Sequence, residues 1–179
     1  MPVTVKHPSL PTIDLASANK EIVAALDSAF SEVGFCICNN AYLDQEIRED
    51  AFAASRAFHK LPETVKASYA INSAHRGYIS PKSSTSRTSS VAKVQRPNTS
   101  ESFMLMHEVL ENDPRLGNPL QGPNQWPQEV PGFQDKMTAY WQDVNCTARK
   151  LAKLCLKALG IEIGLYEAWF RQPTEFLRL

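Results

Sequence analysis

A long amphipathic pattern in the second half of the chain is the strongest constraint on the fold. Apolar residues recur at helical spacing from Phe133 to Leu159, and Gly160 then ends the pattern. At about 1.5 Å per residue, this helix would be a rod of about 40 Å, which is long enough to brace a whole domain. A chain of 179 residues suits a single domain. We therefore expect one domain built along this helix.

Two short strands flank the first helix of the chain. Residues 11–15 form a strand pattern, and Ser17 or Asn19 can cap the helix that follows and ends at Gly34. Residues 35–38 are apolar on both faces, which is typical of a covered central strand. This mixture of helices and strands predicts an α/β mixed (α+β) fold.

A second helix pattern begins after Asp44, which can cap it. Pro62 restricts the backbone of Leu61 and so forces a boundary there. His59 lies near the C-terminal end of this helix, where an imidazole can hydrogen-bond the exposed carbonyl groups. Residues 63–69 are expected to add one or two further helical turns.

A segment without any acidic residue, 82–100, separates two better defined pieces of chain. It contains six Ser, three Thr, two Lys and two Arg. Such a composition buries too little apolar surface to offset the entropy of ordering. We expect a mobile cationic loop between the turn at Gly77 and Pro81 and the apolar run at 101–108. Mobile loops on rigid anchors are frequent binding sites.

The C-terminal residues 175–179 form a strand pattern that has no partner downstream. Two elements precede it: a connector rich in Pro, Gly and Asn at 111–128 and a short helical piece at 165–170. Within the connector, Trp126 and Pro127 are expected to be an apolar anchor. A strand in this position leaves an unpaired edge, which natural domains normally cover. The fold is therefore expected to be unfinished.

Charge and cysteine content argue against several classes of protein. The formal net charge is zero, whereas nucleic-acid and membrane-surface binders need a basic excess. No apolar run reaches the ~20 residues of a membrane span, and the N-terminus lacks a signal-peptide core, so we expect a cytoplasmic protein. The four cysteines, Cys36, Cys38, Cys146 and Cys155, lack the C-x-x-C spacing of zinc or redox sites and are expected to be buried, reduced thiols.

No catalytic or metal-binding motif occurs in the chain. A non-haem iron site uses His-x-Asp or His-x-Glu on one strand plus a second His. The four histidines are His7, His59, His75 and His107, and none of them has this spacing. G-x-S-x-G, P-loop and G-x-G-x-x-G motifs are also absent. We therefore predict neither a catalytic residue nor a metal ligand.

Three polar residues remain as candidates for binding. Arg76 can bind a carboxylate or be a solvated or surface-paired residue. Tyr78 can present its hydroxyl to a ligand or pack its ring under the loop. Arg178 stands in an otherwise apolar strand, and an inward-facing Arg needs an anionic partner. The alternative is that Arg178 pairs with Glu175 at the surface.

Nine short segments, taken in order, carry a resemblance to a known family. They are Pro11 to Leu15, Val33 to Cys36, Phe58 to Pro62, Lys66, Arg76 to Tyr78, Glu101 to Phe103, Asn124 to Pro127, Pro131 to Phe133, and Ala158 to Gly160. Together they resemble the amino-terminal half of the isopenicillin N synthase-like dioxygenases. These are iron(II) and 2-oxoglutarate-dependent oxygenases that include ethylene-forming enzyme and many plant and fungal hydroxylases.

The resemblance implies the N-terminal helices and strands of a double-stranded β-helix (jelly-roll) oxygenase, truncated as the core begins. Residues 8–109 would be the dioxygenase N-terminal region with the mobile loop 82–100. Residues 110–173 would be the connector and the long bracing helix, and 175–179 the first strand of the jelly-roll core.

The resemblance also assigns roles to particular residues. The iron ligands and the Arg-x-Ser clamp for 2-oxoglutarate would follow beyond this chain, so iron(II) and 2-oxoglutarate are implied for the full-length protein and neither is expected to bind tightly here. Arg178 matches a position near the 2-oxoglutarate carboxylate in ethylene-forming relatives. Arg76, Tyr78, Glu101 and Phe103 match segments that line the substrate pocket.

The implied function is that of the N-terminal part of an oxidoreductase that uses O2 to oxidise a small organic substrate. The full-length protein would be the enzyme, and this chain alone would be inactive. One alternative is a short non-catalytic module that pairs with a partner chain through its C-terminal strand. Another is an oxidase of the isopenicillin N synthase type that does not use 2-oxoglutarate.

Overall fold

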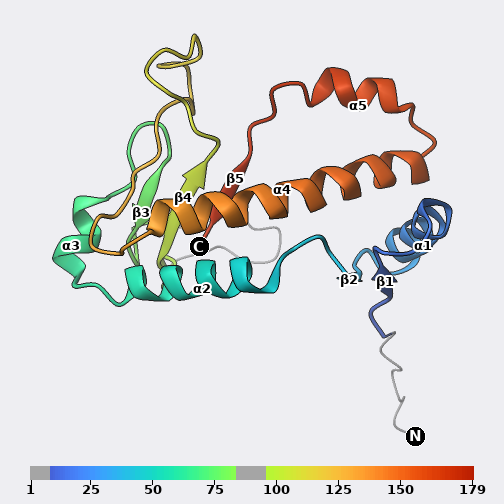
Figure 1. Ribbon diagram of the computed structural model, residues 1–179, viewed down its shortest axis with the longest axis horizontal. Helices are drawn as coiled ribbons and strands as arrows, with labels where there is room; N and C mark the ends of the chain where they lie inside the picture. The colour runs from blue at the N-terminus through green and yellow to red at the C-terminus, as the bar shows by residue number, and fades with distance from the viewer. Residues whose placement is uncertain (1–8, 84–95) are drawn as a thin grey trace, which may run out of the picture. The chain divides into compact units, whose positions relative to one another are not determined.

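The computed structural model describes residues 9–83 and 96–179, which form a mixed arrangement of helices and strands (Figure 1). The elements are β1 (Thr12–Asp14), α1 (Asn19–Glu32), β2 (Ile37–Asn39), α2 (Gln45–His59), α3 (Glu63–Ser68), β3 (Gly77–Ile79), β4 (Ser102–Met106), α4 (Phe133–Ala158), α5 (Ile163–Trp169) and β5 (Phe176–Arg178). They divide into a first unit, Met1–Ile47 with Ala139–Pro173, and a second unit, Arg48–Thr138 with Thr174–Leu179.

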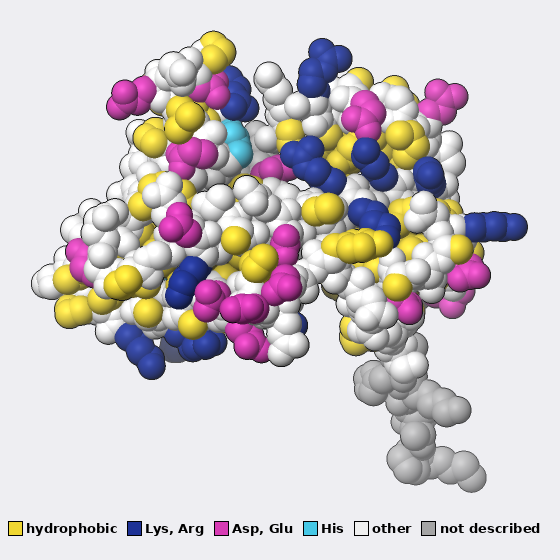
Figure 2. Space-filling view, viewed as in Figure 1, with side chains coloured by type: hydrophobic (Ala, Val, Ile, Leu, Met, Phe, Trp, Pro, Cys, Tyr) yellow, Lys and Arg dark blue, Asp and Glu magenta, His cyan; other side chains and the backbone are white. Residues whose placement is uncertain are grey.

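Among the described residues, no helix is long and apolar enough to cross a membrane. On the face seen in Figure 2, side chains of both charges occur among hydrophobic ones. The cytoplasmic location stays a prediction.

The first unit is built on a parallel pair of strands. β1 and β2 pair with Ile13 opposite Cys38. The core beside this pair comes from β1, α1 and α4 and consists of Ile13, Leu15, Ile22, Leu26, Ala29 and Leu154. The strand at 11–15 is confirmed.

Two predictions about the first unit are wrong. The residue before α1 is Ala18, and no side chain caps this helix, so neither Ser17 nor Asn19 has the expected role. β2 is also not covered on both faces, because Phe35 is 72% and Ile37 48% exposed. A two-stranded sheet buries only the strand face that meets the helices.

Local signals place α2 and α4 correctly. Asp44 Oδ1 accepts hydrogen bonds from the backbone N–H groups of Glu46 and Ile47 at 2.8 and 3.1 Å, as an N-cap does. α2 ends at His59, whose Nδ1 lies 2.9 Å from the carbonyl oxygen of Ser55 and so caps the last turn.

The long helix is likewise confirmed. α4 covers Phe133–Ala158, and Gly160 follows with φ of +69°, the left-handed conformation that ends many helices. The mobile loop at 82–100 stays a prediction, because residues 84–95 of that loop lie outside the described part of the chain. The predicted domain boundaries also stay predictions.

The cysteine prediction is confirmed in part. All four cysteines are free thiols. None is fully buried, however: Cys146 is exposed, and Cys36, Cys38 and Cys155 are half-buried. Their positions on a half-covered strand and on the flank of a helix explain the difference.

The second unit contains the antiparallel sheet β3-β4-β5. Tyr78 pairs with Phe103, and Met104 pairs with Arg178. The strand predicted at 175–179 is therefore present as β5, and within the described residues it is an edge strand whose sheet partner is β4.

A tight turn leads into β3. Asn72 Oδ1 accepts hydrogen bonds from the backbone N–H groups of Ala74 and Arg76. Gly77 then adopts φ of +119°, and a Cβ at this position would collide with the carbonyl oxygen of Tyr69. The prediction of a glycine-dependent turn at Gly77 is confirmed.

Candidate functional site

Four side chains of the second unit form one charged network. Lys66 Nζ of α3 lies 2.6 Å from Glu101 Oε2, and the Tyr78 hydroxyl of β3 donates a 2.5 Å hydrogen bond to the same oxygen. Glu63 adds a second carboxylate, 3.2 Å from Lys66 Nζ. We call Glu63, Lys66, Tyr78 and Glu101 the Lys66 network.

The network shifts the pKa values of its members. The hydrogen bond to Glu101 raises the pKa of Lys66 despite the opposing effect of burial. Burial raises the pKa of Tyr78 to about 12, and Glu101 acts in the same direction. Burial favours the neutral form of Glu101, but Lys66 and Tyr78 outweigh it and lower the pKa of this carboxyl. At neutral pH the network therefore holds an ammonium, a carboxylate and a neutral phenol.

Arg76 is completely buried and binds backbone carbonyl groups. Its Nη1 donates to the carbonyl oxygens of Ala74 and Leu120 at 2.6 and 2.8 Å, and its Nη2 donates to that of His107 at 2.9 Å. Burial lowers the pKa of Arg76, and Glu108 opposes this shift. These contacts join the turn before β3 to the segments after β4, and a contact with substrate stays a prediction.

Phe103 lies in an aromatic cluster and is 0% exposed. Its ring centroid is 4.7 Å from that of Phe58 on α2 and 5.7 Å from that of Phe133 on α4, both in edge-to-face geometry. The ring of Tyr78 also meets Phe58, with centroids 5.9 Å apart. Phe103 therefore joins the sheet to the helices, and its predicted contact with substrate stays a prediction.

Arg178 lies on the opposite face of the sheet from Tyr78 and Phe103. Side chains alternate along a strand, and directly paired residues share a face. Phe103 pairs with Tyr78, whereas its neighbour Met104 pairs with Arg178. The structure thus brings Tyr78 and Glu101 into contact but does not bring them together with Arg178.

Arg178 is oriented by a residue of the neighbouring strand. Its Nε donates a 3.0 Å hydrogen bond to Ser102 Oγ. The Arg178 side chain is otherwise exposed on the edge strand. The guanidinium carries further N–H donors beside Nε, and these can bind a carboxylate.

The sequence did not single out Lys66 and Glu63 as members of a site. Their spacing of three residues on α3 is a local sign of an ion pair. The decisive partner, Glu101, lies 35 residues further along the chain, and only the paired strands β3 and β4 bring it close.

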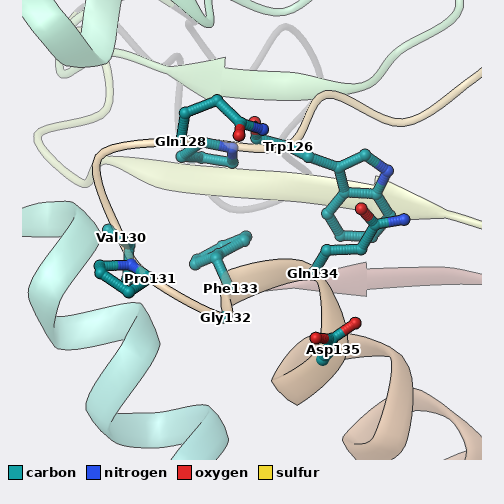
Figure 3. Close-up of a pocket in the computed structure, with 9 residues that line it drawn as sticks. Trp126, Gln128, Val130, Pro131, Gly132, Phe133, Gln134 and Asp135 are labelled. Carbon is teal, nitrogen blue, oxygen red and sulfur yellow. The ribbon is translucent and has the colours of Figure 1, made fainter.

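A separate pocket of about 240 Å³ lies where the connector enters α4 (Figure 3). Its lining residues all come from the segment 126–135: Trp126, Pro127, Gln128, Val130, Pro131, Gly132, Phe133, Gln134 and Asp135. Trp126 is half-buried and donates from Nε1 to Glu108 at 3.2 Å, and Pro127 is buried, so the predicted apolar anchor is confirmed. None of the predicted site residues lines this pocket.

The acidic, histidine and cysteine side chains of the described residues do not gather into a metal centre. Within the described ranges, no group of three or more His, Cys, Asp or Glu side chains is placed to hold a metal ion. Two of the histidines have structural contacts instead: His59 caps α2, and His107 Nε2 lies 2.6 Å from Gln121 Oε1.

The fold is that of iron(II) and 2-oxoglutarate oxygenases. A 2OG-Fe(II) oxygenase family protein from Caulobacter crescentus matches with a TM-score of 0.79 and 19% identity, over 96% of this chain and 55% of that one. Neurospora crassa T7H, solved with alpha-KG, matches with a TM-score of 0.73 and 21% identity, over 94% of this chain and 53% of that one.

The chain belongs to the family described as non-haem dioxygenase in morphine synthesis N-terminal, whose model matches residues 10–129. Azadirone synthase LFS of Melia azedarach is 30% identical over 92% of this chain and 48% of its own length. The 2-oxoglutarate-dependent dioxygenase eupC of Phoma sp is 26% identical over 94% of this chain and 55% of its own length. The chain thus spans about half the length of the relatives that it matches.

Proposed function

We propose that this chain is the N-terminal part of an iron(II) and 2-oxoglutarate-dependent oxygenase that oxidises a small organic substrate with O2. The match of residues 10–129 to the dioxygenase N-terminal family carries the proposal. The half-length correspondence with 2-oxoglutarate-dependent dioxygenases supports it. In this proposal, the iron ligands belong to a part of the protein outside these 179 residues, and the chain alone is inactive.

The sheet β3-β4-β5 supplies one wall of the cofactor cavity in this proposal. The supporting observation is the chemistry of one face of the sheet, where Arg178 and the buried Ser102 provide a cation and a hydroxyl beside apolar side chains. A guanidinium of this kind binds carboxylates with two parallel hydrogen bonds. Arg178 would therefore contact a carboxylate of 2-oxoglutarate, with Ser102 fixing its orientation.

The Lys66 network lies next to the start of β4, and one of its members is placed to supply the substrate contact. Of the four residues predicted to bind substrate, Glu101 has the most exposed side chain, at 29%, whereas Arg76, Tyr78 and Phe103 are buried. We assign the direct contact to Glu101, because this residue precedes β4 and a substrate bound on the Arg178 face can reach it around the end of the strand. Tyr78 holds its carboxylate in place, and Arg76 and Phe103 fix the turn and the strand that carry the network.

Two anaerobic calorimetric titrations test the proposal. The 179-residue chain is titrated with iron(II), and the protein encoded by the whole reading frame is titrated in parallel. We expect one stoichiometric iron site in the longer protein, none in the short chain, and succinate formation in the longer protein only. A tight iron site in the short chain would refute the assignment. A reading frame that stops after Leu179 would favour the non-catalytic pairing module, for which the edge position of β5 is the supporting feature.

A further inference from the structure

Two thiols of the first unit lie close together on one strand. Cys36 comes just before β2, and Cys38 lies within it, so their spacing of two places both side chains on the same face. Their Sγ atoms are 3.9 Å apart, and both cysteines are free and half-buried. Both pack against the core cluster that contains Ile13 and Leu154.

The separation of the two sulfur atoms suits chelation better than a disulfide. A disulfide needs sulfur atoms about 2.05 Å apart. The observed 3.9 Å would have to shrink by almost half, while pairing with β1 holds Cys38 in place. Two thiolates that share a two-coordinate ion lie on opposite sides of it, so with metal–sulfur bonds of about 2.3 Å their sulfur atoms are at most roughly 4.6 Å apart. The pair therefore has to open by less than about 1 Å to share an ion.

The two thiolate ligands limit which metal ion the site can bind. Thiolates are soft ligands that favour copper(I), zinc and iron-sulfur clusters. Zinc needs about four ligands and clusters need more than two, but the described residues offer no group of three or more suitable side chains. Cys155 packs on the same core but does not complete such a group. Copper(I) is the soft ion that two thiolates satisfy.

We propose that Cys36 and Cys38 form a two-thiolate binding site for copper(I). Two copper-sulfur bonds form and two S–H bonds break, with both protons passing to solvent. Copper stays in the +1 state, so no oxidant or reductant is required.

A competition titration tests this site independently of any oxygenase activity. The reduced, metal-free 179-residue chain is titrated anaerobically with copper(I) against a colorimetric copper(I) chelator. We expect one copper(I) per chain. Mutation of an outer-shell partner of a metal ligand already costs about 10- to 100-fold in affinity, so the loss of one of two ligands in Cys36→Ser or Cys38→Ser should weaken binding by at least about 100-fold. Cys146→Ser is the matched control, because this cysteine is exposed and outside the pair, and its affinity should be unchanged.

The proposal would be overturned if the wild-type chain bound no stoichiometric copper(I), or if Cys146→Ser lost as much copper(I) affinity as the variants of the pair. Loss of the site in Cys155→Ser would also overturn it, because it would mean a three-thiolate centre. Circular dichroism checks that each variant is folded. X-ray absorption of the wild-type complex needs no variant and should show sulfur as the dominant neighbour of copper. Zinc(II) should give no stoichiometric binding under the same conditions.

Discussion

The hydroxyl of Tyr78 donates to the same carboxylate oxygen of Glu101 that Lys66 contacts, so two buried donors share one acceptor atom. Lys66 is buried, with only 7% of its surface exposed to solvent. A buried ammonium without a carboxylate is costly because it has lost its hydration. The stability of the second unit therefore depends on Glu101 being charged and in place.

We predict that Glu101→Gln destabilises the chain by about 2 to 3 kcal/mol, because it leaves the buried ammonium of Lys66 with an exposed partner, Glu63. Urea denaturation measures the loss. The matched control is Glu167→Gln, which breaks the 2.7 Å ion pair with Lys153. Both side chains of this pair are largely exposed, 41% for Lys153 and 62% for Glu167. That change should cost at most about 1 kcal/mol. Equal losses in the two variants would refute a special role for the network.

The second prediction concerns alkaline pH. The pKa of Tyr78 is raised from 10.0 to about 12 in the folded chain. A raised pKa means that its stabilising contribution is complete below pH 10.0 and is lost as pH rises toward 12. The raised pKa of Lys66 acts with the same sign. Tyr78→Phe should therefore flatten part of the fall in unfolding free energy across this range, and an unchanged slope would contradict the argument.

The third prediction compares two glycines with positive φ. At Gly77, φ is +119° and an added Cβ would collide with the backbone of Tyr69, whereas at Gly34, φ is +85° and the space around the Cβ position is open. Gly34→Ala should cost about 1 kcal/mol, from backbone strain alone. Gly77→Ala should cost about 3 kcal/mol or more, because a steric clash adds to the strain. Thermal unfolding of both variants checks the order, and a reversed order would refute it.

Local chemistry explains which parts of the fold could be predicted from the sequence. Asp44 caps α2 and Gly77 makes its turn through contacts with residues close in the chain, so short patterns suffice. The start of α1 after Ala18 could not be predicted from a capping residue, because no side chain caps this helix and its buried stripe holds it against the core. The exposure of Phe35 could not be read either, since an apolar strand looks the same whether or not a second layer covers it.

The candidate site was harder to predict because it depends on strand register. Tyr78 and Glu101 were both selected from the sequence, but their contact, and the role of Lys66, follow from the pairing of β3 with β4. The same register places Arg178 on the other face. A shift of one residue would reverse that assignment, and the sequence alone does not exclude such a shift.

The last prediction concerns Arg178 in the full-length protein. A charge-assisted hydrogen bond between its guanidinium and a carboxylate of 2-oxoglutarate is worth about 1.5 to 3 kcal/mol. Arg178→Leu should therefore weaken 2-oxoglutarate binding by roughly ten- to a hundredfold while iron affinity changes little. Arg178→Lys should restore only part of the affinity, because an ammonium lacks the planar fork. Anaerobic calorimetry with 2-oxoglutarate gives the dissociation constants.

Two further variants separate binding from general effects of charge. Arg171→Leu removes an exposed arginine that lies outside the sheet and should leave 2-oxoglutarate binding unchanged. Ser102→Ala removes the hydroxyl that orients Arg178 Nε and should cost about threefold to tenfold, since a net hydrogen bond contributes about 1 kcal/mol. If Arg178→Leu instead binds 2-oxoglutarate as Arg171→Leu does, Arg178 is a surface residue of the edge strand, and the cosubstrate contact must come from another part of the protein.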